Sequence, residues 1–332
     1  MTFAAILGQD AAVATLRRAL ASGRVHHAYR FEGPDGVGKE LAAFALAQAL
    51  VCTERDGTVD GCGVCSACQR AVTFAKSPPH VPLHPDVIVI ERGLYPAAVL
   101  GRSTDELRDI SVHQIRKVIG PRLAFRPHEG RARIILVRRP EELSVDAANA
   151  LLKTLEEPPA DTHFVLLTSR ARELVDTIRS RTLAVRFAPL GDSVLSSILQ
   201  ARGVTGEPLR AALELAGGSA SLALAHGDPA ADEPRTAFVS AVLAALDGPD
   251  ASLALAVAST KEKDRDVLTE RLAAVAAALA RRAKAAASGA PDDARRDAER
   301  FEIVTTAMRD VDRNAQPALL LESMILRMRA IA

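Results

Sequence analysis

The sequence predicts an α/β P-loop domain with a parallel sheet, followed by a small helical domain and an all-α C-terminal domain. Three observations lead to this fold class. A glycine-rich loop lies between a strand-like and a helix-like segment, such segments alternate up to about residue 188, and strand patterns then stop. Alternation of this kind is typical of a parallel sheet with helices on both faces.

The glycine-rich loop covers residues 33–39 and reads GPDGVGK. Gly33, Gly36 and Gly38 let backbone N–H groups point at phosphate oxygens, and Lys39 can reach the terminal phosphates. The strand–loop–helix context supports a nucleotide-binding loop.

Apolar periodicity predicts the other elements of the α/β domain. The first helix carries Val13, Leu16 and Leu20 at helical spacing, and Pro158 stops a later helix. The expected strands are 29–32, 87–90, 134–137 and 164–168, and the expected helices are 10–22, 40–51, 112–119 and 147–155.

Only helical patterns follow residue 189. Glycines 217 and 218 end a helix, and the Pro- and Asp-rich composition predicts a break at 228–234 and a loop at 288–293. We expect an α/β domain at 1–188, a small helical domain at 189–229 and a C-terminal helical domain at 230–332. The helices expected in the last two are 193–201, 209–216, 237–245, 267–287, 294–311 and 318–330.

The metal-holding partners of a phosphate loop are missing. The residue after Lys39 is normally Ser or Thr, whose hydroxyl binds Mg²⁺, and here it is Glu40. Acidic residues are expected where a later strand ends, but Arg138 and Arg139 stand there. We interpret these two side chains as surface charges.

Without these groups, we expect no ATP hydrolysis, because phosphoryl transfer depends on metal-based charge neutralisation and a positioned water. Glu141 and Glu142 lie nearby, but Pro140 and a shifted register make them poor substitutes. The backbone N–H groups of the loop survive, so the sequence leaves residual binding of ATP or ADP open.

Composition excludes some classes of protein. The net charge of +1 and the 3% aromatic content give little basis for a nucleic-acid-binding surface, although a local basic stripe is compatible with them. No apolar stretch is long enough to span a bilayer, and residues 1–5 do not begin a secretory signal. We expect a soluble cytoplasmic protein with no membrane partner.

The four cysteines, Cys52, Cys62, Cys65 and Cys68, form a C-x9-C-x2-C-x2-C pattern. Two-residue gaps let thiolates converge on one ion, and four sulfur ligands suit a closed, structural Zn²⁺ site. Glycines 57, 61 and 63 supply tight turns. Disulfides and an iron–sulfur cluster are the alternatives, and the cytosolic expectation disfavours the disulfides.

Residues 143–159 strongly resemble a signature of bacterial DNA polymerase III clamp-loader subunits of the AAA+ family. The cysteine module after the P-loop helix resembles the same family, as do residues 84–86 before a strand and residues 177–181. The resemblance runs from about residue 6 to residue 186 and implies that the C-terminal helices form a collar.

The family has two relevant kinds of member. Gamma/tau subunits hydrolyse ATP, whereas delta-prime subunits share the fold and the zinc module but typically do not. This chain departs from the active kind at Glu40, Arg138 and Arg139, and at Ser221, near which an active subunit would place a sensor arginine. The pattern resembles the delta-prime kind.

The resemblance also implies an arginine finger. In the family, a Ser-Arg-Cys motif presents an arginine to ATP held by a neighbouring subunit; here the motif is Ser180-Arg181-Thr182. Arg181 is therefore the expected finger. Whether Arg179 shares its role stays open, and a solvated or salt-bridged arginine is the plainer interpretation.

The expected function is an accessory, non-catalytic subunit of a five-subunit loader with gamma/tau and delta partners, which places a sliding clamp on primer–template DNA. One alternative is an active gamma/tau-like ATPase, and another is a zinc-dependent nucleic-acid-binding module. Asn149, Lys153, Glu156 and Glu157 are either interface contacts or solvated residues, and the sequence does not choose between these. The histidine pair at 26–27 is interpreted as local structure.

Overall fold

The computed structural model describes residues 2–54, 59–102, 109–129, 131–227, 229–248, 265–287, 289–312 and 316–331. The chain divides into two compact units. The first comprises Met1–Ala201 with Ala216–Ser221, and the second comprises Arg202–Leu215 with Leu222–Ala332.

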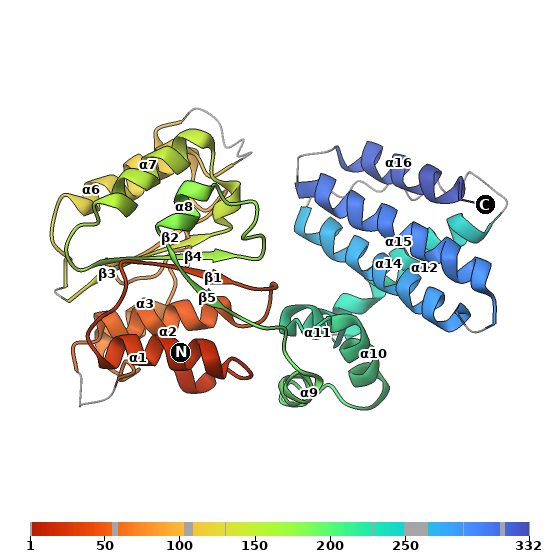
Figure 1. The fold of residues 1–332 in the computed structure, drawn as a ribbon, viewed down its shortest axis with the longest axis horizontal. Helices are drawn as coiled ribbons and strands as arrows, with labels where there is room; N and C mark the ends of the chain where they lie inside the picture. The colour runs from red at the N-terminus through yellow and green to blue at the C-terminus, as the bar shows by residue number, and fades with distance from the viewer. Residues whose placement is uncertain are drawn as a thin grey trace. The chain divides into compact units, whose positions relative to one another are not determined.

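The first unit is built on a parallel sheet (Figure 1). Its strand order is β2-β3-β4-β1-β5, so the chain crosses over between neighbouring strands. The register is continuous, for example with Phe31 of β1 opposite Leu167 of β4 and Val185 of β5. The strands are β1 (Ala28–Glu32), β2 (Val87–Ile90), β3 (Arg133–Arg138), β4 (Thr162–Thr168) and β5 (Leu183–Arg186).

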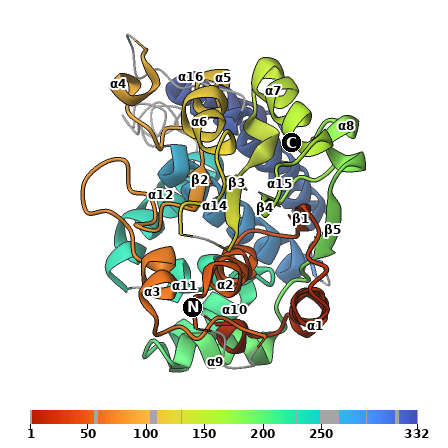
Figure 2. The same cartoon turned by 90° about the vertical axis from the view of Figure 1, so that its left-hand side faces the viewer.

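Helices cover both faces of this sheet (Figures 1 and 2). Helices α1 (Asp10–Ala21), α2 (Lys39–Val51) and α3 (Ser66–Val72) lie on one face. Helices α6 (Gly120–Leu123), α7 (Val145–Glu156) and α8 (Asp176–Ser180) lie on the other. Two-sided burial explains why the inner strands are almost continuously apolar. The predicted α/β domain with a parallel sheet is confirmed.

Two helices are placed by clear local signals. Helix α2 starts after Gly38, whose φ of 100° ends the loop, and it is buried on nearly all sides because it is Ala- and Leu-rich. Helix α7 is capped by the Ser144 hydroxyl, which accepts a hydrogen bond from the Ala147 N–H. Its apolar face, including Leu151 and Leu155, packs into the core between α7 and the sheet.

Some predictions differ from the structure in the first unit. The helix predicted at 112–119 is present as α5 (Val112–Gln114), a π-helical turn (Ile115–Ile119) and then α6. Strand β5 has no counterpart among the predictions because three of its four residues are exposed, which leaves little apolar pattern to detect. The short 3₁₀ turns Phe3–Ala5 and Pro140–Glu142 and the helix α4 (Ala97–Leu100) were also not predicted.

In the described part of the chain, β5 is followed by α9 (Asp192–Gln200), α10 (Gly206–Ala216), α11 (Ala220–Gly227) and α12 (Pro229–Asp247). The break predicted at 228–234 is wrong for residues 229–234. Pro229 occupies the first helical position, where its missing N–H is not needed, and the helix continues through Pro234. Residue 228 lies outside the described residues.

The second unit has a core formed by α12, α14 (Arg265–Ala286), α15 (Pro291–Asp312) and α16 (Pro317–Arg329). The loop predicted at 288–293 ends earlier than expected, because α15 begins at Pro291; residue 288 is not among the described residues. Arg282 joins three helices of this unit through ion pairs with Asp247 at 2.7 Å and Asp297 at 2.9 Å. No described helix is long and apolar enough to cross a membrane.

The cysteine-bearing segment is seated directly on α2. The Gln48 side chain donates to the Cys68 carbonyl at 2.9 Å, and a Cβ atom added at Gly61 would lie 2.7 Å from the Gln48 carbonyl carbon. Only glycine fits between these two stretches of backbone. The close approach fixes the segment against the helix that follows the phosphate loop.

We expect Gly61→Ala to lower the free energy of unfolding by about 1–3 kcal/mol, because the added methyl group forces two backbones apart. Chemical denaturation measures the loss. The matched control is Gly191→Ala, where an added Cβ meets nothing within 4 Å. Equal stability of the two variants would show that the close packing at Gly61 is unimportant.

Candidate functional site

The phosphate loop connects β1 to α2. Gly36 and Gly38 have φ angles of 73° and 100°, and Gly33 has a φ of 153°. These left-handed conformations are ones that only glycine adopts easily, and they turn the chain sharply into the helix. The local geometry matches the predicted strand–loop–helix arrangement.

Lys39 folds back onto its own loop. Its Nζ donates to the carbonyl oxygens of Gly33 at 2.5 Å and Pro34 at 2.6 Å, and lies 3.4 Å from the Asp35 carboxylate. Burial lowers the pKa of Lys39, and the nearby charges of Asp35 and Glu141 oppose that shift. The ammonium group is therefore engaged by loop carbonyls.

A segment distant in sequence lies against the loop. The Ala220 N–H donates to the Gly36 carbonyl at 3.0 Å. A Cβ atom at Gly36 would lie 2.1 Å from Ser221 Oγ and 2.4 Å from Ser219 Oγ. Ser221, near which an active subunit would be expected to carry a sensor arginine, thus presents a short hydroxyl to the loop.

The Arg138 guanidinium at the end of β3 pairs with two carboxylates. Its Nη2 contacts Glu40 Oε1 at the start of α2, and its Nη1 lies 2.7 Å from Glu91 Oε2. The side chain is 22% exposed. Burial lowers the pKa of Arg138, but Glu40 and Glu91 outweigh it and raise the pKa overall.

The interpretation of Arg138 as a surface charge is therefore wrong. Glu40 and Arg138 are the two departures from the metal-binding pattern, and they satisfy each other across the site. The sequence held a signal for this pairing, since the two positions where an active loop holds one metal ion carry opposite charges. Arg139 is 45% exposed and lies 3.8 Å from Glu142, so it agrees better with the prediction.

Two buried acids follow these arginines. The Glu141 side chain is only 2% exposed and lies 3.5 Å from Arg170 Nε. The Glu142 side chain lies 3.4 Å from Arg92, and burial raises the pKa of Glu142. The structure thus places one well-buried carboxylate, Glu141, close enough to influence Lys39 electrostatically.

The four cysteines converge as their spacing predicts. Their Sγ atoms all lie within 4.8 Å of one another, with Cys52–Cys65 at 4.0 Å and Cys62–Cys68 at 3.9 Å. Four sulfurs about 2.3 Å from a tetrahedral zinc ion would be about 3.8 Å apart. The cluster therefore fits a zinc-sized ion. Gly63, with a φ of 73°, turns the chain within it, and Gly57 lies outside the described residues.

The electrostatics of the thiols favour a metal ligand at Cys65. Burial raises the pKa of the Cys65 thiol, but hydrogen bonds from the Cys68 N–H and from Thr53 outweigh it and lower the pKa to about 6. Burial raises the pKa of Cys52 and Cys68. Because the thiolate is the form that binds a metal, the lowered pKa favours Cys65 as a metal ligand at neutral pH.

Arg181 lies at the C-terminal end of α8. Its guanidinium is 2.6 Å from Glu156 Oε1 and donates to the Thr177 carbonyl at 3.1 Å. Arg179 instead pairs with Asp176 of its own helix at 2.9 Å. Arg181 lines a shallow hollow of about 480 Å³ with the stacked rings of His26 and His27, whose centroids are 4.3 Å apart.

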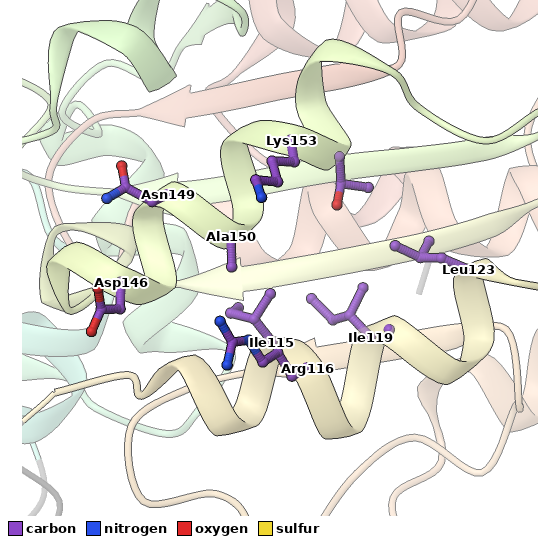
Figure 3. A pocket seen from close by; sticks show the side chains of 10 residues that line it. Ile115, Arg116, Ile119, Leu123, Asp146, Asn149, Ala150 and Lys153 are labelled. Carbon is purple, nitrogen blue, oxygen red and sulfur yellow. The ribbon is translucent and has the colours of Figure 1, made fainter.

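A second hollow of about 390 Å³ lies between α7 and the helical segment at 115–123 (Figure 3). Ile115, Ile119 and Ala150 form its apolar part, while Asn149 and Lys153 lie on its α7 side. Of the polar residues on α7 that the sequence left open, Glu156 is now assigned to an ion pair. Asn149 and Lys153 line a surface hollow.

Comparison with known proteins identifies the family. The family model described as "DNA polymerase III, delta subunit" matches residues 8–191, which is more than half of the 332 residues. The chain belongs to this DNA polymerase III subunit family. The clamp-loader resemblance of the sequence is thereby confirmed at the level of the family.

Relatives of two kinds match this family member about equally well. It is 34% identical over 203 residues to the DNA polymerase III subunit delta' of Pseudomonas aeruginosa, covering 61% of this chain and 53% of that protein. It is 33% identical over 198 residues to the subunit gamma/tau of Mycobacterium tuberculosis, covering 60% of this chain and 30% of that protein. Identity alone does not separate the two kinds.

A solved structure, a DNA polymerase III gamma subunit-related protein from Thermotoga maritima, aligns with 96% of this chain and 98% of its own. The TM-score is 0.45 and the sequence identity is 17%, a likeness that carries no argument about function.

The cysteine geometry predicts one tightly bound zinc ion per copy of this protein. Chelation, or Cys68→Ser, should remove the ion, lower the melting temperature and expose residues 52–68 to proteolysis, because four ligands in one short segment stabilise its fold. Metal analysis by mass spectrometry and limited proteolysis measure these effects. Iron in place of zinc, or fewer than four free thiols in the metal-stripped, denatured chain, would contradict the assignment.

Proposed function

We propose that this chain is a delta-prime-like clamp-loader subunit that does not hydrolyse ATP and that offers Arg181 to ATP on a neighbouring subunit. The observation that carries this proposal is the Arg138 ion pair with Glu40 and Glu91. It occupies the place where a nucleotide-hydrolysing loop holds a metal ion between a hydroxyl and a strand-end carboxylate.

Electrostatics argue against a metal ion at this position. At an effective dielectric constant of about 20, two like unit charges 4 Å apart repel by about 4 kcal/mol, and a divalent cation doubles that value. The Arg138 guanidinium pairs with both carboxylates that would otherwise attract a cation, and it offsets one of their two negative charges. The residues present do not fit Mg²⁺, so the loop lacks the charge neutralisation that phosphoryl transfer requires.

The remaining parts of the proposal follow from membership of the family. The partners would be gamma/tau and delta subunits in a hetero-pentamer, which loads a sliding clamp onto primer–template DNA. Residues 189–229 would act as the lid domain and residues 230–332 as part of the collar. The cysteine cluster would hold a structural Zn²⁺, and whether ATP or ADP occupies the degenerate loop is left to measurement.

An active gamma/tau-like ATPase is the second candidate, and one observation favours it. Burial lowers the pKa of Lys39, and the buried Glu141 carboxylate is close enough to oppose that shift, so the loop still has an acid near its lysine. ATP turnover by the purified chain, abolished by Lys39→Ala, would establish this candidate and remove the first one.

Arg138→Asp should place three carboxylates together, at positions 40, 91 and 138, with no cation between them. We expect the variant to be about 2 kcal/mol less stable than the wild type and to regain stability when Mg²⁺ or Mn²⁺ is added, because a carboxylate cluster binds such ions. Thermal melts with and without the ion measure this.

The matched control is Arg139→Asp, which makes the same charge change on a more exposed side chain. It should lose less stability and should not respond to the ion. A wild-type chain that is itself stabilised by Mg²⁺ would refute the claim that Arg138 stands in for a metal.

Arg181→Ala should leave assembly of the reconstituted loader intact but lower its DNA-stimulated ATPase. An arginine finger supplied in trans raises turnover by about 10³–10⁵-fold in other NTPases, so the adjoining site should fall nearly silent. Arg179→Ala serves as the control and should have little effect, because Arg179 is paired with Asp176 on its own helix. Unchanged ATPase in Arg181→Ala would remove the finger assignment.

A further inference from the structure

Glu156 forms an ion pair with Arg181. Among the residues that the structure describes, no other side chain outside α8 does so. Glu156 is the last residue of α7, and α7 and α8 lie side by side on one face of the sheet (Figures 1 and 2). The Arg181 side chain is 36% exposed and the Glu156 side chain is 49% exposed. The Arg181 guanidinium can therefore exchange Glu156 for another ligand.

The backbone that carries Arg181 is firmly held. The buried Thr182 hydroxyl donates to the Ile178 carbonyl at 2.9 Å and accepts from Arg30 Nη1 at 2.7 Å. Arg30 Nη1 also donates to the Arg179 carbonyl at 2.8 Å. These contacts tie the end of α8 to β1, so the Arg181 side chain can move while its backbone stays in place.

Of the described residues that line the hollow beside Arg181, Glu156 alone is acidic. Burial lowers the pKa of His27, and the charges of His26 and His163 add to that shift, so the His27 ring is neutral at neutral pH. His27 therefore does not compete for the Glu156 charge. The guanidinium of Arg181 is the cation that Glu156 holds.

We propose that Glu156 is a positioning residue that holds the Arg181 guanidinium in the free chain and releases it to the terminal phosphates of a nucleotide on the neighbouring subunit. This inference rests on the proposed function. An exposed ion pair is weak, whereas a phosphate group offers a guanidinium bidentate, charge-assisted bonds. Glu156 therefore competes with the nucleotide for the same N–H groups, and removing its charge favours the engaged state.

The test is Glu156→Gln in the fully reconstituted loader. We expect kcat/KM for ATP to rise by up to about fivefold, the factor that corresponds to an exposed ion pair of about 1 kcal/mol. The rise should shrink as the salt concentration increases, because the pair it removes is screened. Glu156→Asp keeps the charge but is one methylene shorter, so it should hold Arg181 less closely and give a smaller rise than Glu156→Gln.

Two controls separate this role from a structural one. Glu157→Gln removes an adjacent charge that makes no ion pair with Arg181 in the part of the chain that the structure describes, and it should leave kcat/KM unchanged. Glu156→Gln should also have no effect when Arg181 is already replaced by alanine. An equal effect in that background would show that Glu156 acts by another route.

The outcomes distinguish a failure of the proposed function from a failure of the positioning role of Glu156. If Arg181→Ala does not lower ATPase, the proposed function fails and the positioning role fails with it. If Arg181→Ala lowers ATPase but Glu156→Gln gives wild-type or reduced kcat/KM, the finger assignment stands and the positioning role is wrong.

Discussion

A parallel sheet buried on both faces is the constraint on which the rest of the first unit depends. Because its strands run in the same direction, their carboxyl ends meet at one edge. That edge carries the phosphate loop after β1 and Arg138 at the end of β3. The buried helix α2 then fixes the loop to the cysteine cluster, which packs against the same helix.

Charged groups at this edge pair with one another. Arg138 pairs with both Glu40 and Glu91, and Lys39 donates to loop carbonyls. A phosphate loop whose lysine is already bonded to loop carbonyls can remain as a structural connection. The same domain carries Arg181 at its surface, so the two parts of the proposed function, the absence of hydrolysis and the arginine finger, depend on separate groups.

The parts of this structure that depend on residues close together in the sequence could be predicted. The glycine loop, helices α1 and α2 and the cysteine cluster each lie within one short segment, where spacing determines geometry. Contacts between distant segments could not be predicted this way. Arg138 meets Glu40 only because β3, a strand of the sheet, ends near the start of α2. Strand β5 is too exposed to show an apolar pattern.

The segment at 219–221 limits which substitutions the loop can accept. Gly36 has no room for a side chain because two serine hydroxyls, themselves 3.0 Å apart, lie where its Cβ would be. Its positive φ adds a second barrier to any larger residue. Trimming both serines would still leave the Ser221 backbone nitrogen 2.7 Å from an added Cβ, so position 36 is restricted to glycine as long as this segment lies against the loop.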